Sequence, residues 1–256
     1  QMLSCIFVYL CLKFRKLVSV NRKSCRKLMT AVFNKAIGTI AAVSTGSIVS
    51  CENHGTVTIT PSRIGKFAIQ YVGGLVGIAQ ATSADFNAME SCTNEGAVTF
   101  DGPYSSRIFV GGVCGGTTAG AGEFGDYGVF KTLKNNAAVT FNLPSASSVQ
   151  TTYLNLGGVI GYAEADLDDC DNTGVVTVNA PMNPSTSAHN LQRPAIAGVA
   201  GTVLYNVKNC DNSAPINIKG AFAAGSENTV GAGQNNYASF GGVVALVGTS
   251  ANSVTG

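Results

Sequence analysis

A run of acidic side chains is the first feature of the sequence that could support chemistry. Five carboxylates fall between positions 164 and 171: Glu164, Asp166, Asp168, Asp169 and Asp171. Hard cations such as Ca²⁺ bind several carboxylate oxygens, so this acidic cluster is a candidate calcium site. Its spacing fits neither an EF-hand loop nor a calcium-binding nonapeptide, and related segments place neutral residues or Lys208 there. We therefore favour a solvated turn that discourages edge pairing, and we assign no metal-ligating residue.

Cysteine offers a second chemistry, disulfide bonding. The chain holds eight cysteines, and four recur at one position of a repeat described below: Cys51, Cys92, Cys170 and Cys210. Stacked repeats would bring their Cα atoms into disulfide range. One repeat has Leu133 at this position, and Cys114 stands where other repeats have Val, Ile or Ala, so these positions suit apolar side chains. We expect a column of buried thiols, with disulfides as the less favoured alternative; no CxxC or Cys/His spacing suggests zinc.

Acid–base and nucleophilic catalysis lack a candidate set of residues. The two histidines, His54 and His189, fall in an expected turn and an expected linker. Glycosidases need two carboxylates across a cleft, and lyases need a base with a cation or metal that neutralises charge. The only dense group of acids lies in one place, at positions 164–171, so we expect no enzyme and assign no catalytic residue and no cofactor. A carbohydrate-active β-helix, similar to a polysaccharide lyase or glycosidase, stays open as the alternative because distant carboxylates can meet in a folded chain.

Two short motifs alternate along the chain and must position these residues. The first is a small-residue strand rich in glycine, with copies at Val72–Gly77, Val110–Gly115, Leu156–Gly161 and Ile196–Gly201 and degenerate copies at Ile37–Ala42 and Phe240–Ala245. The second follows the pattern Cys-x-Asn-x-Gly-x-Val-Thr, with copies at Cys51–Ile59, Cys92–Phe100, Leu133–Phe141, Cys170–Val178 and Cys210–Ile218. The second motif starts at intervals of 41, 41, 37 and 40 residues, which indicates a repeat protein.

The end of the second motif predicts a half-buried strand. Apolar residues such as Val98 and Phe100 alternate with a threonine such as Thr99, which is the period of a strand with one buried face. The glycine before this strand (Gly55, Gly96 or Gly174) is expected to supply a turn with positive φ. Each repeat exposes one apolar strip, so it is stable only when it stacks on its neighbours.

Stacking predicts an all-β fold, a parallel β-helix or β-solenoid with repeats of about 40 residues. An asparagine at the third position of the second motif can then hydrogen-bond from coil to coil and satisfy the backbone of a turn: Asn53, Asn94, Asn135, Asn172 and Asn212. Five stacked copies would make a rod of about 24 Å with one rung per repeat, or about 48 Å with two. Polar linkers of uneven length, such as Pro181 to Pro194 and Gly220 to Ser239, are expected as loops on one side.

Charge divides the chain into two parts. Residues 1–35 carry eight of the 16 Lys and Arg residues and no acid, while the rest carries eight bases and all 14 acids. We expect a basic, partly apolar N-terminal segment at 1–35, either a signal remnant or not native to the domain, and a solenoid at 36–256 that continues beyond the C-terminus. An acidic body argues against nucleic acid as a partner. The apolar run at residues 3–12 is too short to span a bilayer, so membrane association would need an anchor outside this sequence.

Together the two motifs resemble the GLUG-type repeats of bacterial extracellular proteins. Such repeats occur in surface lipoproteins and adhesins of Bacteroidetes, and the resemblance covers about residues 37 to 256. It implies a β-helical surface module at an extracellular, outer-membrane-associated location. From it we expect a non-enzymatic structural or adhesive module, monomeric within a longer chain, that displays loops to a glycan or to a cell-surface or host protein.

Overall fold

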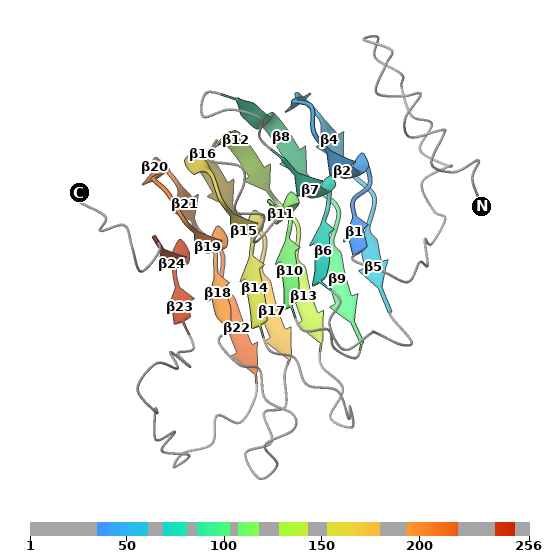
Figure 1. Cartoon of the computed structure of the whole chain (residues 1–256). Helices are drawn as coiled ribbons and strands as arrows, with labels where there is room; N and C mark the ends of the chain where they lie inside the picture. Colours follow the sequence, from blue (N-terminus) through green and yellow to red (C-terminus); the bar gives the residue numbers. More distant parts are fainter. Residues whose placement is uncertain are drawn as a thin grey trace.

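The computed structural model describes residues 35–60, 69–80, 86–102, 107–117, 128–142, 153–179, 194–219 and 239–248. Within these ranges the chain forms strands and turns and no helix, and the strands stack into parallel sheets (Figure 1). No described helix is long and apolar enough to cross a membrane. The predicted all-β solenoid is therefore confirmed.

Four parallel sheets run along the solenoid, and we name them A to D. Sheet A contains β1 (Lys35–Ile37), β6 (Ile69–Gly73), β10 (Arg107–Gly111), β14 (Tyr153–Gly157), β18 (Ala195–Ala197) and β23 (Ser239–Gly241). Sheet B contains β2 (Ala41–Ser44), β7 (Val76–Ala79), β11 (Cys114–Gly116), β15 (Ile160–Ala163), β19 (Ala200–Val203) and β24 (Val244–Val247). Sheet C contains β3 (Ile48–Val49), β4 (Glu52–Asn53), β8 (Asn87–Asn94), β12 (Val129–Asn135), β16 (Asp166–Asn172), β20 (Val207–Lys208) and β21 (Asp211–Asn212). Sheet D contains β5 (Val57–Ile59), β9 (Val98–Asp101), β13 (Val139–Asn142), β17 (Val176–Asn179) and β22 (Ile216–Lys219).

One repeat makes one coil. The chain visits sheets A, B, C and D in turn and then begins the next coil, so that Val57 of β5 pairs with Val98 of β9. The two-rung alternative is excluded by this register. The described strands form five coils through all four sheets and a sixth coil with strands in A and B, as the motif copies predict.

The first motif is a corner rather than the single strand that the sequence predicts. The second glycine of the motif and the residue after it separate a sheet A strand from a sheet B strand in each of the inner coils, as Gly74 and Leu75 do between β6 and β7. Backbone hydrogen bonds continue through this corner from coil to coil, as in Gly74 N to Gly112 O and Gly112 N to Gly158 O, both at 2.9 Å. The corner is therefore stacked as regularly as the sheets beside it.

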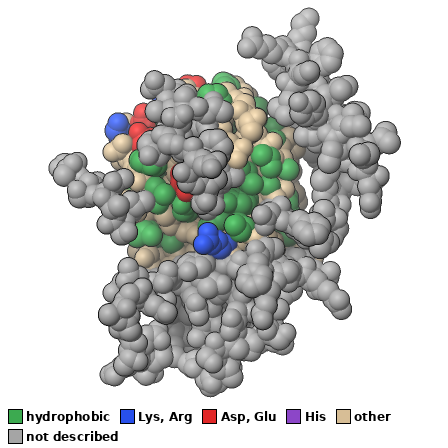
Figure 2. All heavy atoms as spheres, in the orientation of Figure 1, with side chains coloured by type: hydrophobic (Ala, Val, Ile, Leu, Met, Phe, Trp, Pro, Cys, Tyr) green, Lys and Arg blue, Asp and Glu red, His purple; other side chains and the backbone are tan. Residues whose placement is uncertain are grey.

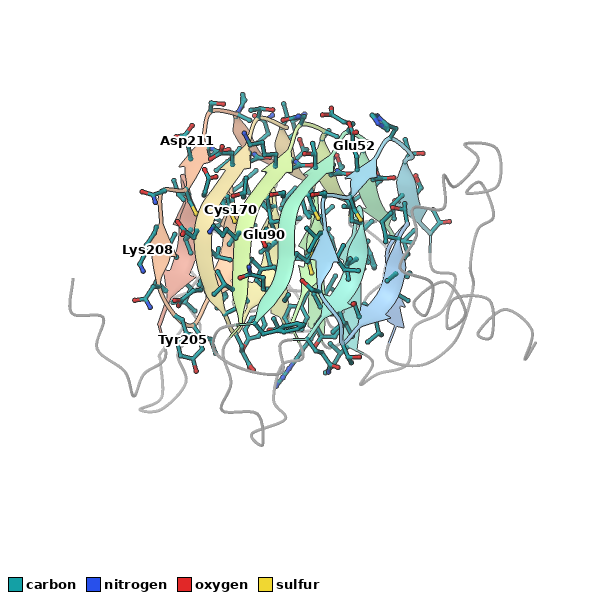
Figure 3. The ribbon with its side chains drawn as sticks, turned by 90° about the horizontal axis from the view of Figure 1, so that it is seen from above. Glu52, Glu90, Cys170, Tyr205, Lys208 and Asp211 are labelled. Carbon is teal, nitrogen blue, oxygen red and sulfur yellow. The ribbon has the colours of Figure 1, made fainter. Side chains whose placement is uncertain are left out.

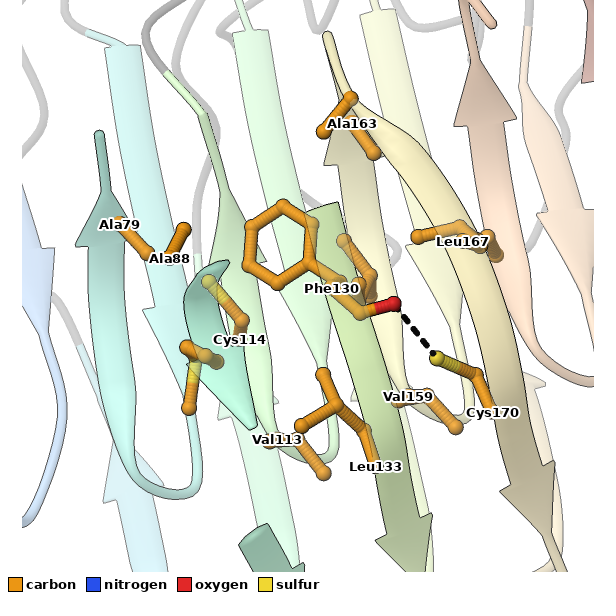
Figure 4. Packing of buried hydrophobic residues seen from close by; sticks show 14 of the residues in the cluster. Ala79, Ala88, Val113, Cys114, Phe130, Leu133, Val159, Ala163, Leu167 and Cys170 are labelled. Carbon is orange, nitrogen blue, oxygen red and sulfur yellow. Dashed lines mark hydrogen bonds between the residues drawn. The ribbon is translucent and has the colours of Figure 1, made fainter. Parts of the chain in front are cut away.

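Two apolar cores fill the cross-section. Sheets A and D enclose one core, with Val110 and Leu156 facing Phe100 and Phe141, whose rings stack with centroids 5.4 Å apart. Sheets B and C enclose the other, with Cys114 and Ile160 facing residues such as Phe130 (Figure 4). The alternation of apolar and polar residues along sheet D is confirmed, since Val98, Val139 and Val176 are fully buried.

A seam of asparagines lies between the two cores. Each Nδ2 donates to the Oδ1 of the asparagine in the next coil, at 2.7–2.8 Å, through Asn53, Asn94, Asn135, Asn172 and Asn212. The same Nδ2 donates to the carbonyl two residues later, for example Asn94 to Gly96 O at 2.8 Å. Both amide protons are thus used, and the predicted asparagine ladder is confirmed.

The predicted positive φ at the glycines of the second motif is wrong. In each of the five coils the described residue with positive φ is not glycine and directly precedes the cysteine or leucine position: Ser50, Ser91, Thr132, Asp169 and Asn209. Position 96 needs glycine for another reason: a Cβ there would lie 2.0 Å from the Gly55 carbonyl oxygen. The glycine permits close approach of two coils instead of a left-handed turn.

Candidate functional site

An aromatic cluster lies outside the two cores. Tyr71 on β6 and Phe109 on β10 alternate with core residues of sheet A, so they occupy the face of that sheet turned away from sheet D. Their ring centroids are 4.9 Å apart, and the Phe109 ring lies 5.2 Å from that of Tyr162 on β15. Sheets A and B therefore meet at this cluster.

Glycines allow sheet B to approach sheet A this closely. A Cβ at Gly115 would meet Val72 N at 2.6 Å, and one at Gly161 would meet Val110 N at the same distance. Because there is no side chain at these positions, the strands of sheet B lie against the backbone of sheet A. The rings of the aromatic cluster fill the space beside that contact.

Polar groups border the cluster. Tyr162 donates its hydroxyl proton to Glu164 Oε1 at 2.8 Å, and the Glu164 backbone N–H donates to Thr117 Oγ1 at 2.9 Å. Thr202 donates to Asn155 Oδ1 at 2.5 Å in the neighbouring coils. The buried rings of the cluster are therefore edged by a few fixed polar groups.

The chemistry of the cluster favours binding over proton transfer. Burial, and then the hydrogen bond to Glu164, raise the pKa of Tyr162 far above its ordinary value. A phenol with such a pKa stays protonated at neutral pH, so it donates a hydrogen bond and is a poor general base. Tyr71 and Phe109 are only 3% and 2% exposed, whereas Tyr162 and Glu164 are half-buried. Figure 2 shows hydrophobic side chains, interspersed with polar ones, on the face of the solenoid turned toward the viewer.

The acidic cluster lies on β16 and its approach, inside sheet C. The interpretation as a solvated turn that protects an edge is wrong, because β16 pairs with β12 on one side and with β20 and β21 on the other. Asp166 accepts from the backbone N and Nδ2 of Asn206, and Asp168 accepts from Asn209 Nδ2. Among the residues that the structure describes, no three His, Cys, Asp or Glu side chains are grouped to hold a metal ion.

Lysines neighbour these acids in register on sheet C. Lys131 pairs with Glu90 on one side and with Asp168 on the other, and Asp168 also pairs with Lys208. Opposite charges thus alternate along one row of the sheet, which Figure 3 views from above with Glu90 and Lys208 labelled. Alternating charges on neighbouring strands favour this register, because like charges directly opposite one another are destabilising.

The structure places the repeated cysteines in one column, as predicted. Cys92 and Cys170 are fully buried, and each pairs in register with Leu133 between them. Cys51 and Cys210 at the two ends are half-buried. The described cysteines carry free thiols, and Cys170 donates a long hydrogen bond to Phe130 O at 3.5 Å (Figure 4).

The histidines are not brought together. His54 is exposed and its Nε2 lies 3.1 Å from Glu52 Oε1, at the C–D corner of the first coil. His189 lies outside the described residues. His54 and Glu52 form an exposed surface pair.

Sequence reasoning missed the aromatic cluster. Its rings come from non-equivalent repeat positions, since the register pairs Tyr71 with Phe109 in sheet A but places Tyr162 opposite Gly116 in sheet B. A usable signal was the aromatic residue directly before the first motif, in Tyr71-Val72 and Phe109-Val110. The contribution of Tyr162 depends on how closely the two sheets approach, which no local pattern indicates.

Comparisons with known proteins give no relative. The chain matches no protein-family model, no curated protein and no solved structure. The resemblance to GLUG-type repeats therefore depends on the two motifs alone.

Proposed function

We propose that this chain is a non-enzymatic, structural and adhesive β-solenoid module of a secreted or surface-anchored bacterial protein. It acts as a rigid spacer and presents its connecting segments to a glycan or to a protein on another cell surface. Two features support the proposal: the resemblance of its motifs to GLUG-type repeats, and the placement of its variable segments. The second feature carries more weight because it follows from the register of the strands.

All connections from sheet D to sheet A begin and end along one edge of the solenoid. The strands of D are parallel and in register, and so are those of A, so corresponding strand ends are aligned. The connections cover residues 60–68, 102–106, 143–152, 180–194 and 220–238, and their lengths differ widely. Variable segments on a regular scaffold are the usual place for binding specificity.

The described polar side chains support a scaffold more than a catalyst. Asn94 and Asn135 bond to each other between coils, and Asp166 bonds to Asn206 of the next coil. Tyr162 is paired with Glu164, at the half-buried margin of the aromatic cluster. Side chains that are already hydrogen-bonded in this way hold the coils together. A ligand would instead contact the half-buried border of the aromatic cluster, at Tyr162 and Glu164, and the edge of the solenoid where the connections from sheet D to sheet A begin and end.

Binding and turnover are separated by two assays on the same sample. The purified full chain is applied to a glycan array, and it is also incubated with a panel of polysaccharides while new reducing ends and absorbance at 235 nm are followed. We expect binding of at least one glycan class without product. Product formation above a boiled control would overturn the non-enzymatic proposal and support the carbohydrate-active alternative.

A matched pair of variants locates the binding surface. In one, residues 220–238 are replaced by the shortest connection of the same edge, residues 102–106; in the other, residues 118–127 between sheets B and C are shortened. We expect the first variant to lose affinity for the identified ligand by about tenfold or more and the second to keep it. Equal loss in both would place binding elsewhere, and unchanged far-UV circular dichroism confirms that each variant folds.

A further inference from the structure

The four repeated cysteines form two isolated pairs. Val49 pairs with Glu90 and Glu52 pairs with Thr93, which places Cys51 directly opposite Cys92. In the same way, the pairing of Asp168 with Lys208 and of Asp171 with Asp211 places Cys170 opposite Cys210. Leu133 lies between Cys92 and Cys170, so neither inner cysteine has a thiol neighbour on that side.

The spacing within each pair suits a disulfide. Parallel strands in register lie about 4.8 Å apart, and disulfides join Cα atoms separated by about 4.4–6.8 Å. Cys92 Sγ reaches toward the first coil, where it contacts Ile48 O at 3.5 Å. Cys51 and Cys210 have no regular strand geometry themselves, since β3 and β20 end before them and β4 and β21 begin after them. This break gives the outer cysteines freedom to adjust.

The two thiols of each pair differ in acidity. The side-chain interaction with Cys92 lowers the pKa of Cys51 to about 7. The same interaction, together with burial, raises the pKa of Cys92. The second pair repeats the pattern, because the interaction with Cys170 lowers the pKa of Cys210. In both pairs the half-buried outer sulfur is the more readily ionised, and the thiolate is the attacking species in disulfide exchange.

We propose that Cys51–Cys92 and Cys170–Cys210 are two inter-coil disulfide sites, oxidised by a small-molecule disulfide such as oxidised glutathione. The outer thiolate attacks one sulfur of the oxidant, forms a mixed disulfide and releases one glutathione thiolate. The inner thiol then loses its proton and attacks the outer sulfur, which releases the second glutathione. Two protein thiols are oxidised, and one glutathione disulfide is reduced to two thiols.

The links join the end coils to the central stack. One disulfide would tie the first coil to the second, and the other would tie the fourth to the fifth. Each closes a loop of about one repeat, which restricts the unfolded chain. The inference concerns the folded chain in any oxidising environment and does not depend on the proposed binding function.

Peptide mapping tests the pairing directly. The full chain is incubated with oxidised glutathione, its remaining thiols are alkylated, and it is digested with trypsin without reduction. Arg63 and Lys66 lie between Cys51 and Cys92, and Lys208 lies between Cys170 and Cys210, so each pair is split into two separate peptides. We expect the two linked peptide pairs, with Cys114 recovered in alkylated form after denaturation. Links between Cys92 and Cys170, or no link within either pair, would overturn the proposal.

Variants separate pairing from general thiol reactivity. Cys51→Ser should abolish the first link, leave the second unchanged and leave Cys92 unlinked. Leu133→Cys places a thiol between the two isolated pairs, so it should produce new links from position 133 to Cys92 and to Cys170. Random oxidation of unfolded chains would not favour these neighbouring partners. Oxidation should raise the midpoint of thermal unfolding by about 10 °C, and by less in Cys51→Ser. If the links form but the midpoint of thermal unfolding does not change on oxidation, the disulfide sites are supported and their stabilising role is contradicted.

Discussion

At the scale of single residues, the described core contains one buried side chain without a hydrogen-bond partner. Gln70 on β6 is fully buried, and neither its amide oxygen nor its amide nitrogen has a hydrogen-bond partner. The third coil has Ile108 in register with Gln70, and the fourth coil has Leu154 in register with Ile108, so the two following coils fill this position with apolar side chains. Burying an unpaired amide costs free energy that an apolar side chain would not.

Replacing Gln70 by leucine is therefore expected to stabilise the solenoid. Gln70→Leu removes the unpaired amide while keeping most of the buried volume, and we expect the free energy of unfolding to rise by about 1–3 kcal/mol. Urea unfolding followed by circular dichroism measures the difference. The reverse change, Ile108→Gln, should destabilise by a similar amount. A loss of stability in Gln70→Leu would mean that the amide has a partner such as bound water.

The reactivity of Cys51 should depend on pH through its neighbour. Its lowered pKa makes the thiolate form above about pH 7, so alkylation by iodoacetamide should be half-maximal there and rise with pH. Cys92→Ala removes this neighbouring side chain, and the midpoint should move up toward the ordinary value of 9.0. Mass spectrometry of the peptide that ends at Arg63 follows the rate. In the same sample Cys114, whose pKa burial raises to about 12, should stay unlabelled.

Not every residue-level feature was predictable. The asparagine ladder followed from one residue type at a constant position, because stacked amides can satisfy one another. The positions of the residues with positive φ could not be predicted in this way. Three of them, Ser50, Ser91 and Thr132, are of residue types that seldom adopt positive φ. Sequence reasoning assigned that conformation to the glycines because glycine adopts it most easily.

At the scale of elements, the two repeated motifs meet in the middle of each coil. A Cβ on Gly112, in the A–B corner, would lie 2.4 Å from Asn135 Cγ in the C–D corner and 2.1 Å from Gly158 O. Gly74, Gly158 and Gly198 make the same approach to Asn94, Asn172 and Asn212. The alternation of a glycine motif with an asparagine motif is thus explained by one contact. The sequence predicted strands from each motif but not this contact, because it joins residues of two different motifs, 14 to 23 positions apart in the chain.

Alanine at two equivalent corner positions tests that contact. Gly112→Ala places a methyl group against the Gly158 carbonyl oxygen and the Asn135 side chain, and we expect it to lower the free energy of unfolding by about 3 kcal/mol or more. Gly242, the same position in the sixth coil, has no atom within 4 Å of an added Cβ, so Gly242→Ala should change stability by less than about 0.5 kcal/mol. Chemical denaturation of both variants gives the comparison. Equal effects would mean that loss of glycine flexibility, and not crowding at the seam, determines the cost.

At the scale of the whole molecule, burial declines toward the ends of the solenoid. Val139 and Phe141 of the third coil are fully buried, whereas Ile216 and Ile218 of the fifth are only partly buried. Phe240 and Leu246 of the sixth coil are 46% and 47% exposed. The sequence predicted a stack of equal repeats, and the register confirms the stack. It did not predict the four-sheet cross-section, because the corners depend on contacts between the motifs.

This gradient predicts unequal protection of the backbone amides from hydrogen exchange. In a stack each coil is held by its immediate neighbours, so a terminal coil loses half of its interfaces and opens at lower free energy than a central coil. The amides of β13 should exchange most slowly, because their strand is paired on both sides by β9 and β17 and covers a fully buried core. Those of β22 should exchange earlier, because this strand pairs only with β17 among the described strands and its side chains are partly exposed. Peptide-resolved exchange followed by mass spectrometry on the reduced chain measures both strands in one experiment. Uniform protection would show that the coils unfold as one cooperative unit and that interfaces across the whole length, not nearest neighbours alone, set the stability of each repeat.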